Sequence, residues 1–221
     1  MESWQREFIQ FIFKNEALRF GEFKTKSMRL SPYFFNAGGL NTGEATLELG
    51  KYYAKAITHF MGKDQDIIYG PAYKGIPLSV MASMQLQAVE NVESAYCFNR
   101  KESKDHGEKG LLVGKQPTAG SNIVIIDDVI TAGTSIRETL DLLTPIEGIN
   151  IKGVIVAVDR QEKGVEKPVS ALQEIKEDFG IDVYSIITME QIIKMLDEGA
   201  FPQVDASTLG KMNEYRNQYG V

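Results

Sequence analysis

Apolar residues near the start of the chain recur at the spacing of one helix face. Four large apolar side chains, three or four positions apart, carry this pattern: Trp4, Phe8, Phe11 and Ile12. The pattern predicts an amphipathic helix that ends before residue 21 and packs its apolar face on the rest of the molecule. From residue 20 to residue 39 the chain turns to short aromatic runs interrupted by glycines, which indicates strands or a loop that presents side chains.

A second helical pattern follows directly. Asn41 and Glu44 have the spacing of a helix N-cap arrangement. Apolar residues then recur every three or four positions: Leu49, Tyr53, Ala56 and Phe60. The pattern predicts a helix over residues 43–61, which ends at the glycine in position 62.

Beyond this helix, short branched apolar runs alternate with helical patterns. The predicted strands are residues 66–69, 95–98, 123–126, 154–158 and 183–187. The predicted helices are residues 76–89, 135–143, 170–179, 189–196 and a polar terminal helix, 207–219. Short, continuously apolar strands separated by helices are typical of a mostly parallel sheet covered on both faces. We therefore predict an α/β protein with a single domain over residues 1–221, including an N-terminal extension of about residues 1–40.

The segment of residues 100–115 interrupts this alternation. It is polar, it contains glycines at positions 107, 110 and 114, and it has few side chains that could pack in a core. Long polar loops in compact domains usually serve a function or are disordered. We therefore predict a loop with a functional role at about residues 100–115.

The composition limits the compartment and the partners. The 221 residues are 43% hydrophobic and 24% charged, as in ordinary globular proteins. A formal charge of −6 argues against binding to nucleic acid or to an acidic membrane by bulk electrostatics, although local basic clusters can still bind small anions. The single cysteine, Cys97, cannot form an intramolecular disulfide, and the first residues do not resemble a signal peptide. No apolar run nears the roughly 20 residues of a membrane span, so we expect a cytoplasmic protein without a nucleic-acid or membrane partner.

The most informative stretch runs from residue 123 to residue 135. A predicted strand ends there in two carboxylates, Asp127 and Asp128, and a loop of small and hydroxyl residues then opens a helix. Ligands bind at this edge of a parallel sheet. Small residues let backbone N–H groups approach a phosphate at a helix N-terminus, whereas the carboxylates suit sugar hydroxyls or a divalent ion. The stretch fits a phosphorylated ribose. The alternative is an acidic turn followed by an ordinary helix cap.

Other nucleotide-binding and catalytic motifs are missing from the sequence. It contains neither G-x-x-x-x-G-K-[ST] nor G-x-G-x-x-G, so kinase and dinucleotide-dependent dehydrogenase interpretations have no motif to support them. With two histidines, one cysteine and no G-x-S-x-G, structural zinc and triad hydrolase chemistry have no support either.

The stretch around the acidic pair resembles a known motif. Branched apolar residues, then Asp127-Asp128 and Thr131-Ala132-Gly133-Thr134-Ser135, are similar to the motif that binds 5-phosphoribosyl 1-pyrophosphate (PRPP) in type I phosphoribosyltransferases. The resemblance implies the fold of that family, a mostly parallel central sheet flanked by helices, with a small N-terminal hood and a flexible catalytic loop. It also implies that the acidic pair binds the ribose hydroxyls and that residues 131–135 bind the 5′-phosphate.

Residues 100–110 concentrate basic side chains and one of the two histidines. Such a run is by default a solvated surface, but cations on a glycine-containing loop can also stabilise a leaving diphosphate and exclude water. Residues 98–102 and 104–107 resemble the catalytic loop of the orotate phosphoribosyltransferases. In that family the loop reaches the site of the neighbouring subunit, which implies a homodimer here. Lys109 departs from the family pattern, which has a glycine at this point.

Three further stretches resemble the same family. Lys26 and residues 31–38 are similar to its orotate site, residues 70–75 to its pyrophosphate loop, and Arg160 to the residue that binds the orotate carboxylate. An arginine suits that task because its planar guanidinium pairs with both oxygens of a carboxylate. The ordinary alternatives are core aromatic residues and plain surface cations.

The resemblance implies a role for each matching position. The catalytic residues would be Lys26, Lys104, His106, Asp127 and Asp128. The PRPP-binding residues would be Lys26, Tyr73, Lys74, Arg100, Lys101, Lys104, His106, Asp127, Asp128, Val129, Ile130, Thr131, Ala132, Gly133, Thr134 and Ser135. The orotate-binding residues would be Lys26, Phe34, Phe35, Thr131 and Arg160. The implied cofactor is Mg²⁺, held mainly by PRPP rather than by protein side chains.

Together these resemblances imply an enzyme that transfers the phosphoribosyl group of PRPP to orotate, forming orotidine 5′-phosphate and diphosphate in pyrimidine biosynthesis. A phosphoribosyltransferase for another base is the alternative among enzymes, because the phosphate motif is shared between them. A regulator that senses PRPP without turning it over is the alternative from another class, since a fold alone does not establish an activity.

Overall fold

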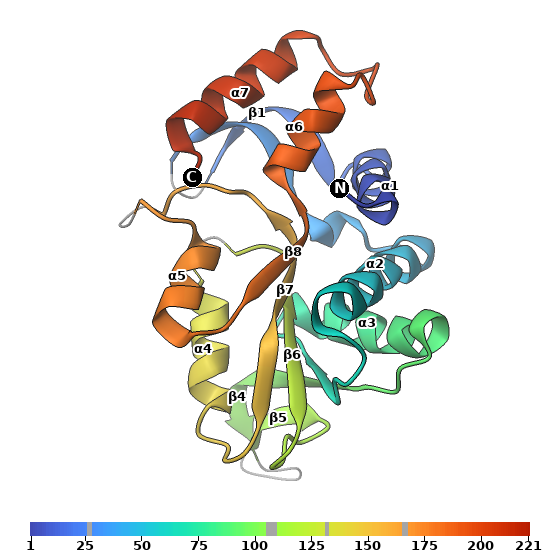
Figure 1. Cartoon of the computed structure of the whole chain (residues 1–221), viewed down its shortest axis with the longest axis vertical. Helices are drawn as coiled ribbons and strands as arrows, with labels where there is room; N and C mark the ends of the chain where they lie inside the picture. Colours follow the sequence, from blue (N-terminus) through green and yellow to red (C-terminus); the bar gives the residue numbers. More distant parts are fainter. Residues whose placement is uncertain (26–27, 105–109, 131–132, 165–167) are drawn as a thin grey trace.

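A six-stranded sheet with helices on both faces forms the body of the molecule (Figure 1). The computed structural model describes residues 1–25, 28–104, 110–130, 133–164 and 168–221, and at Ser103, Lys104 and Gly110 it describes the backbone only. The strand order is β5-β4-β3-β6-β7-β8. The strands are β3 (Ile67–Tyr69), β4 (Ala95–Lys104), β5 (Gly110–Gly114), β6 (Asn122–Asp127), β7 (Asn150–Asp159) and β8 (Val183–Thr188).

The pairing confirms the α/β architecture. Strand β5 runs antiparallel to β4, and the other neighbouring strands run parallel to each other. Two helices, α2 (Gly43–Met61) and α3 (Gly75–Glu90), cover one face of the sheet. The opposite face carries α4 (Thr134–Leu143) and α5 (Ala171–Phe179).

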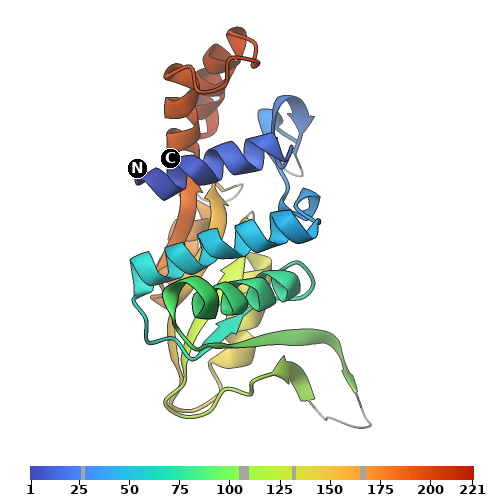
Figure 2. The same ribbon diagram turned by 90° about the vertical axis from the view of Figure 1, so that its right-hand side faces the viewer.

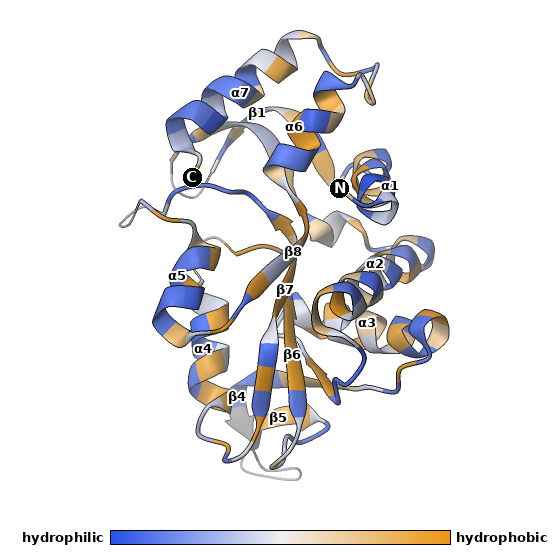
Figure 3. Ribbon diagram, in the orientation of Figure 1, coloured by the Kyte–Doolittle hydropathy of each residue, from blue (hydrophilic) through white to orange (hydrophobic). Residues whose placement is uncertain are grey.

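Strand β6 shows why the central strands are continuously apolar. Successive side chains of a strand point to opposite faces of the sheet. Val124 and Ile126 pack in the core on the α2 and α3 side, whereas Ile123 and Ile125 pack in the core beside α4. All four are fully buried, and burial of each side chain contributes about 1.5–3 kcal/mol. Figure 3 shows the same division, with hydrophobic central strands and helices that are hydrophilic on their outer sides.

The two ends of the chain pack together at one end of the sheet (Figure 1). The elements there are α1 (Ser3–Lys14), β1 (Leu18–Lys24), β2 (Leu30–Phe35), the short 3-10 helix η1 (Ala37–Gly39), α6 (Met189–Asp197) and α7 (Ser207–Tyr219). The rings of Phe13, Phe20 and Phe201 contact one another there, with distances of 4.6 to 6.1 Å between their centroids. We call the antiparallel pair β1 and β2 with η1 the hood. Among the described residues, no helix is long and apolar enough to cross a membrane.

Two local features differ from the sequence-based expectation. Part of residues 100–115 is strand rather than loop, because β4 continues to Lys104 and β5 begins at Gly110. Main-chain hydrogen bonds hold this hairpin, so its polar side chains do not prevent the pairing. Figure 2 shows the hairpin extending away from the body. In addition, Thr42 rather than Asn41 is the N-cap of α2, because its side chain accepts a hydrogen bond from the Ala45 N–H.

Candidate functional site

Several of the predicted site residues, among them Asp127, Asp128 and Lys74, lie where the strand order reverses. Strands β3 and β6 are neighbours, and the chain continues from β3 to β4 on one side and from β6 to β7 on the other. In open α/β sheets the crevice outside the carboxyl ends of such strands is the usual ligand site. The segments that follow β3, β6 and β7 all begin at this edge.

Two buried carboxylates stand at the end of β6. Asp127 is 7% exposed and Asp128 is 5% exposed. One oxygen of Asp127 accepts a hydrogen bond from the Asp128 N–H and the other accepts one from the Ser135 hydroxyl, both at 2.9 Å. Asp128 accepts from the Val129 N–H at 2.9 Å and pairs with the Lys74 ammonium at 2.5 Å. Every carboxylate oxygen of the pair is therefore oriented by a donor from the chain.

The environment of Asp127 favours its protonated form. Burial, together with the charge of Asp128, raises the pKa of Asp127 to about 6, although hydrogen bonds from the Asp128 N–H and Ser135 and the charge of Lys74 oppose this shift. A carboxylate with such a pKa titrates close to neutrality, which is typical of functional sites.

A buried tyrosine of α2 contacts the backbone of the acidic pair. The hydroxyl of Tyr53, in α2, donates a 2.8 Å hydrogen bond to the backbone carbonyl of Asp127. Burial raises the pKa of Tyr53 well above its ordinary value, so the hydroxyl remains a donor at neutral pH. The helical spacing of the sequence accounts for Tyr53 as a packing residue only, and no local signal connects it to the site.

The loop after the acidic pair leads directly into α4. Gly133 precedes the helix with a φ of 71°, a left-handed conformation that favours glycine. A Cβ at this position would also lie 3.3 Å from the Ile175 side chain. Thr134 is exposed at the start of the helix, whereas Ile130 is buried and Val129 is half-buried. The predicted residues Thr131 and Ala132 lie outside the described part of the chain.

The segment after β3 lies against the acidic pair. Gly70 and Gly75 make this possible, because a Cβ on Gly70 would lie 1.9 Å from the Gly75 carbonyl oxygen. Asn99 of β4 accepts a 2.9 Å hydrogen bond from the Ala72 N–H. Lys74 therefore reaches Asp128, 54 positions along the chain, and Tyr73 is 72% exposed beside it.

The two predicted aromatic residues of the hood have different surroundings. Phe35 is 6% exposed and packs in the core. Phe34 points to the opposite side of β2, where its ring stacks on Phe23 and lies 5.4 Å from the Arg19 guanidinium. The structure thus separates the two rings, and only Phe34 has a partly accessible side chain.

Arg160 lies at the end of β7 in contact with the hood. Its Nε and Nη2 donate hydrogen bonds of 2.9 and 2.7 Å to one oxygen of Glu162. Its guanidinium carbon is 4.6 Å from the centre of the Tyr33 ring, and the Tyr33 hydroxyl donates to the same Glu162 oxygen at 2.8 Å. Neither Tyr33 nor Glu162 is among the residues assigned from the sequence. Tyr33 comes from β2, far away in the sequence, whereas Glu162 follows Arg160 by two positions.

The basic segment is described only in part. Arg100 is half-buried on β4, and Lys101 is exposed with an ion pair of 3.4 Å to Glu138 on α4. The side chain of Lys104 and the whole of His106 lie outside the described part of the chain, as does Lys26. Their predicted roles stay predictions.

The carboxyl edge offers few direct ligands for a metal ion. Among the described residues there is no group of three or more histidine, cysteine or acidic side chains that could hold one. The four oxygens of Asp127 and Asp128 already accept hydrogen bonds. As hard oxygen donors, the two carboxylates are of the kind that a divalent cation takes in proteins.

Comparison with known proteins assigns the chain to a family. A model described as "Phosphoribosyl transferase domain" matches residues 40–185. The chain is 45% identical to an orotate phosphoribosyltransferase of Clostridium acetobutylicum over the full length of both proteins. It is 46% identical to one of Shewanella oneidensis, over 100% of this chain and 99% of the other. A crystal structure of an orotate phosphoribosyltransferase of Francisella tularensis superposes with a TM-score of 0.85 at 40% identity, covering 97% of this chain and 100% of that one.

Proposed function

The chain belongs to the orotate phosphoribosyltransferases of the phosphoribosyl transferase family. From this premise we propose which of its residues bind each part of the substrates. The enzyme transfers the 5-phosphoribosyl group of PRPP to orotate and releases orotidine 5′-phosphate and diphosphate, a step of pyrimidine biosynthesis. The buried pair at the carboxyl end of β6 is the observation that carries the assignment of the PRPP site.

The acidic pair binds the ribose of PRPP. Asp127 and Asp128 accept hydrogen bonds from the ribose hydroxyls, since ionised carboxylates are acceptors only. Residues 131–135 bind the 5′-phosphate, because small residues and the N-terminus of α4 give close access to backbone N–H groups and a favourable dipole. Val129 and Ile130 connect these two parts of the site.

Cations on both sides of the acidic pair bind the diphosphate. Lys74, which already lies beside Asp128, and Tyr73 contact it from the segment after β3. Arg100, Lys101, Lys104 and His106 contact it from the basic segment. A bound Mg²⁺ would supply further neutralisation of charge on the diphosphate, beside these cations.

The base lies toward the hood. The fork of Arg160 pairs with the orotate carboxylate, and Phe34 and Thr131 border the ring. Phe35 contributes from the core side of β2, where it anchors the strand. Lys26, in the connection between β1 and β2, reaches both substrates.

The chemistry needs no covalent intermediate with the protein. The bond from the anomeric carbon of PRPP to the diphosphate breaks toward an oxocarbenium-like state, and a ring nitrogen of orotate forms the new bond and loses its proton to solvent. Lys104 and His106 stabilise the negative charge that develops on the leaving diphosphate, and His106 can protonate it. Positioning of the substrates and stabilisation of charge supply most of the rate.

The active form is a homodimer in which residues 100–110 contribute to the partner's site. The hairpin of β4 and β5 extends away from the body (Figure 2). Large apolar side chains are exposed on or beside α3, β4 and β5: Tyr73, Met84, Val89, Tyr96 and Leu111. Exposed apolar side chains of this kind are typical of an interface. With its one cysteine buried as a free thiol, the enzyme suits the reducing cytoplasm.

The specificity is tested by ultraviolet absorbance. Purified protein is mixed with Mg²⁺, PRPP and orotate, and in parallel with uracil, hypoxanthine or adenine in place of orotate. We expect the absorbance of orotate to be lost and the other bases to persist. Turnover of another base would contradict the specificity. Tight binding of PRPP without any turnover would instead favour a sensor.

A further inference from the structure

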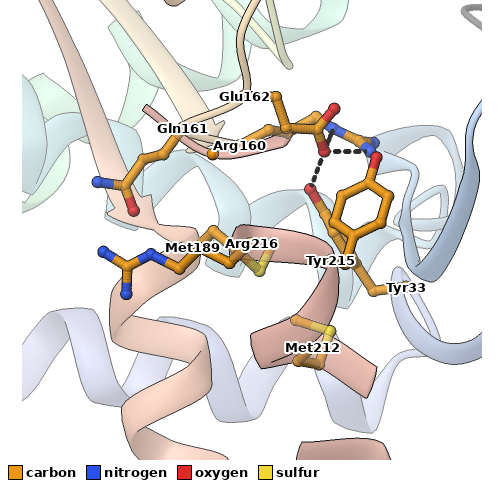
Figure 4. A pocket seen from close by; sticks show the side chains of 9 residues that line it. Tyr33, Arg160, Gln161, Glu162, Met189, Met212, Tyr215 and Arg216 are labelled. Atoms are coloured by element: carbon orange, nitrogen blue, oxygen red, sulfur yellow. Dashed lines mark hydrogen bonds and ion pairs between the residues drawn. The ribbon is translucent and has the colours of Figure 1, made fainter. Parts of the chain in front are cut away.

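After β7 the chain bends so that the side chain of Glu162 contacts that of Arg160 (Figure 4). Gln161, between them, has a φ of 51°, and its N–H donates a 2.8 Å hydrogen bond to the Asp159 side chain. This left-handed conformation is uncommon for a residue other than glycine. The Glu162 carboxylate on one side of Gln161 meets the Arg160 guanidinium on the other.

Glu162 is the centre of a partly buried cluster of charges. One of its oxygens, Oε1, accepts three hydrogen bonds, from Arg160 Nε, Arg160 Nη2 and the Tyr33 hydroxyl. The other, Oε2, is 3.6 Å from Nη1 of Arg29. The side chains of the three charged residues are only 15 to 18% exposed. A carboxylate with so many donors has little freedom to change its position.

Tyr33 and Glu162 together fix the plane of the Arg160 guanidinium. Burial raises the pKa of Tyr33 well above its ordinary value, so its hydroxyl donates to Glu162. The ring of Tyr33 then faces the guanidinium, while Glu162 holds the Nε edge. The Arg160 side chain also hydrogen-bonds to Tyr215 of α7. The cluster thus constrains the orientation of the Arg160 side chain.

The surface hollow beside this cluster adjoins the PRPP loop. Its lining includes Arg160, Glu162 and Arg29 and also Ile130, the residue before the phosphate-binding segment. Among the described residues, the charged side chains around it are three basic and two acidic: Arg29, Arg160, Lys163, Asp159 and Glu162. This excess of positive charge suits a ligand with a single carboxylate.

We propose that Glu162 is a positioning residue for base recognition, which holds the Arg160 guanidinium in the orientation that receives the orotate carboxylate. The inference rests on the proposed role of Arg160. It adds that Glu162, an acidic residue, strengthens the binding of an acidic substrate. Without Glu162 the guanidinium would turn within the hollow, and displacements of about 1 Å at a reacting site can cost about a hundred-fold in rate.

The test compares orotate with uracil, which is the same ring without the carboxylate. In Glu162→Ala we expect the dissociation constant of orotate to rise at least about ten-fold, while the inhibition constant of uracil and the KM of PRPP stay unchanged. Glu162→Gln keeps one acceptor oxygen, so its dissociation constant for orotate should lie between those of the wild type and Glu162→Ala. It also serves as the test variant if Glu162→Ala does not fold. Glu190→Ala is the matched control, because this glutamate pairs with Arg216 nearby and is 62% exposed.

A double-mutant cycle separates this inference from the role of Arg160. If Glu162 acts through Arg160, Glu162→Ala has no further effect on orotate binding in an Arg160→Gln background. Equal weakening of orotate and uracil, wild-type affinity for orotate in both Glu162 variants, or fully additive losses in the cycle would overturn the positioning role. Wild-type orotate affinity in Arg160→Gln alone would instead remove the premise, and turnover of orotate by the unmodified enzyme tests the activity independently.

Discussion

A buried carboxylate at the end of β6 links the chemistry of the site to the stability of the chain. Because burial raises the pKa of Asp127 to about 6 from an ordinary 3.8, the folded chain takes up a proton at a higher pH than the unfolded chain does. The ionised carboxylate therefore destabilises the fold fully above about pH 6. This destabilisation decreases as the pH falls from 6 toward 4 and is absent below that range.

Asp127→Asn keeps the shape of the side chain and removes its charge. We expect the variant to be more stable than the wild type by about 1–3 kcal/mol at pH 7.5, since each pKa unit corresponds to about 1.4 kcal/mol. The gain should vanish near pH 4, and kcat/KM for PRPP should fall by about a hundred-fold or more. Urea unfolding at several pH values measures the stability. Asp141→Asn, at an exposed position of α4, is the control and should change neither quantity.

The same titration should be visible in the unmodified enzyme. Protonation of Asp127 removes an acceptor for the ribose hydroxyls, so the affinity for PRPP should decline as the pH falls below about 6. Carboxyl ¹³C NMR of aspartate-labelled protein follows the group directly, apart from the titration of the substrate phosphates. A spectrum in which every aspartate titrates below pH 4.5 would contradict this expectation.

At the scale of elements, glycines have opposite consequences in the segment after β3 and in α7. A Cβ on Gly70 would overlap the Gly75 carbonyl oxygen, whereas a Cβ on Gly210 meets nothing within 4 Å. The first glycine permits a close approach of two backbone segments. The second lies in a helix, where glycine is unfavourable relative to alanine.

Alanine substitutions separate these two cases. Gly70→Ala should raise the KM of PRPP at least about ten-fold, because the segment carrying Tyr73 and Lys74 must move away from Asp128. Gly210→Ala, its matched control, should leave the kinetics unchanged and stabilise the protein by about 0.5–1 kcal/mol. Steady-state kinetics and thermal unfolding of both variants check the pair. A wild-type KM of PRPP in Gly70→Ala would show that PRPP binding does not need the close approach of Gly70 to Gly75.

At the scale of the whole molecule, the proposed exchange of residues 100–110 between subunits predicts complementation. Lys104→Ala and Asp127→Asn are each expected to be nearly inactive. In a mixed dimer, the site with an intact Asp127 receives the intact Lys104 segment of the partner, so mixing the variants should restore about a quarter of the wild-type activity when subunits exchange at random. Activity of the mixture against time, with sedimentation to establish the dimer, measures this. No recovery despite subunit exchange would mean that each segment serves its own site.

The sequence by itself determined the class of fold and the position of the acidic pair. Hydrophobic periodicity is a local property, so the strand of residues 123–126 and the helix of residues 207–219 could be predicted within a residue or two of β6 and α7. The resemblance to orotate phosphoribosyltransferases rests on contiguous motifs for the same reason. The hairpin of β4 and β5 was harder to predict, because its polar residues pair through the main chain rather than through apolar side chains.

Only the tertiary structure decided which of these segments meet. Lys74 reaches Asp128 across 54 positions, Tyr53 reaches Asp127 across 74, and Tyr33 reaches Glu162 across 129. The packing of α6 and α7 beside the first 40 residues is equally remote in sequence. No periodicity along the chain encodes such pairs, because they form when the sheet brings the ends of separate strands to one edge. The Lys74 ammonium beside Asp128 and the Tyr33 hydroxyl that shares the Glu162 carboxylate with Arg160 are therefore placed only by the folded chain.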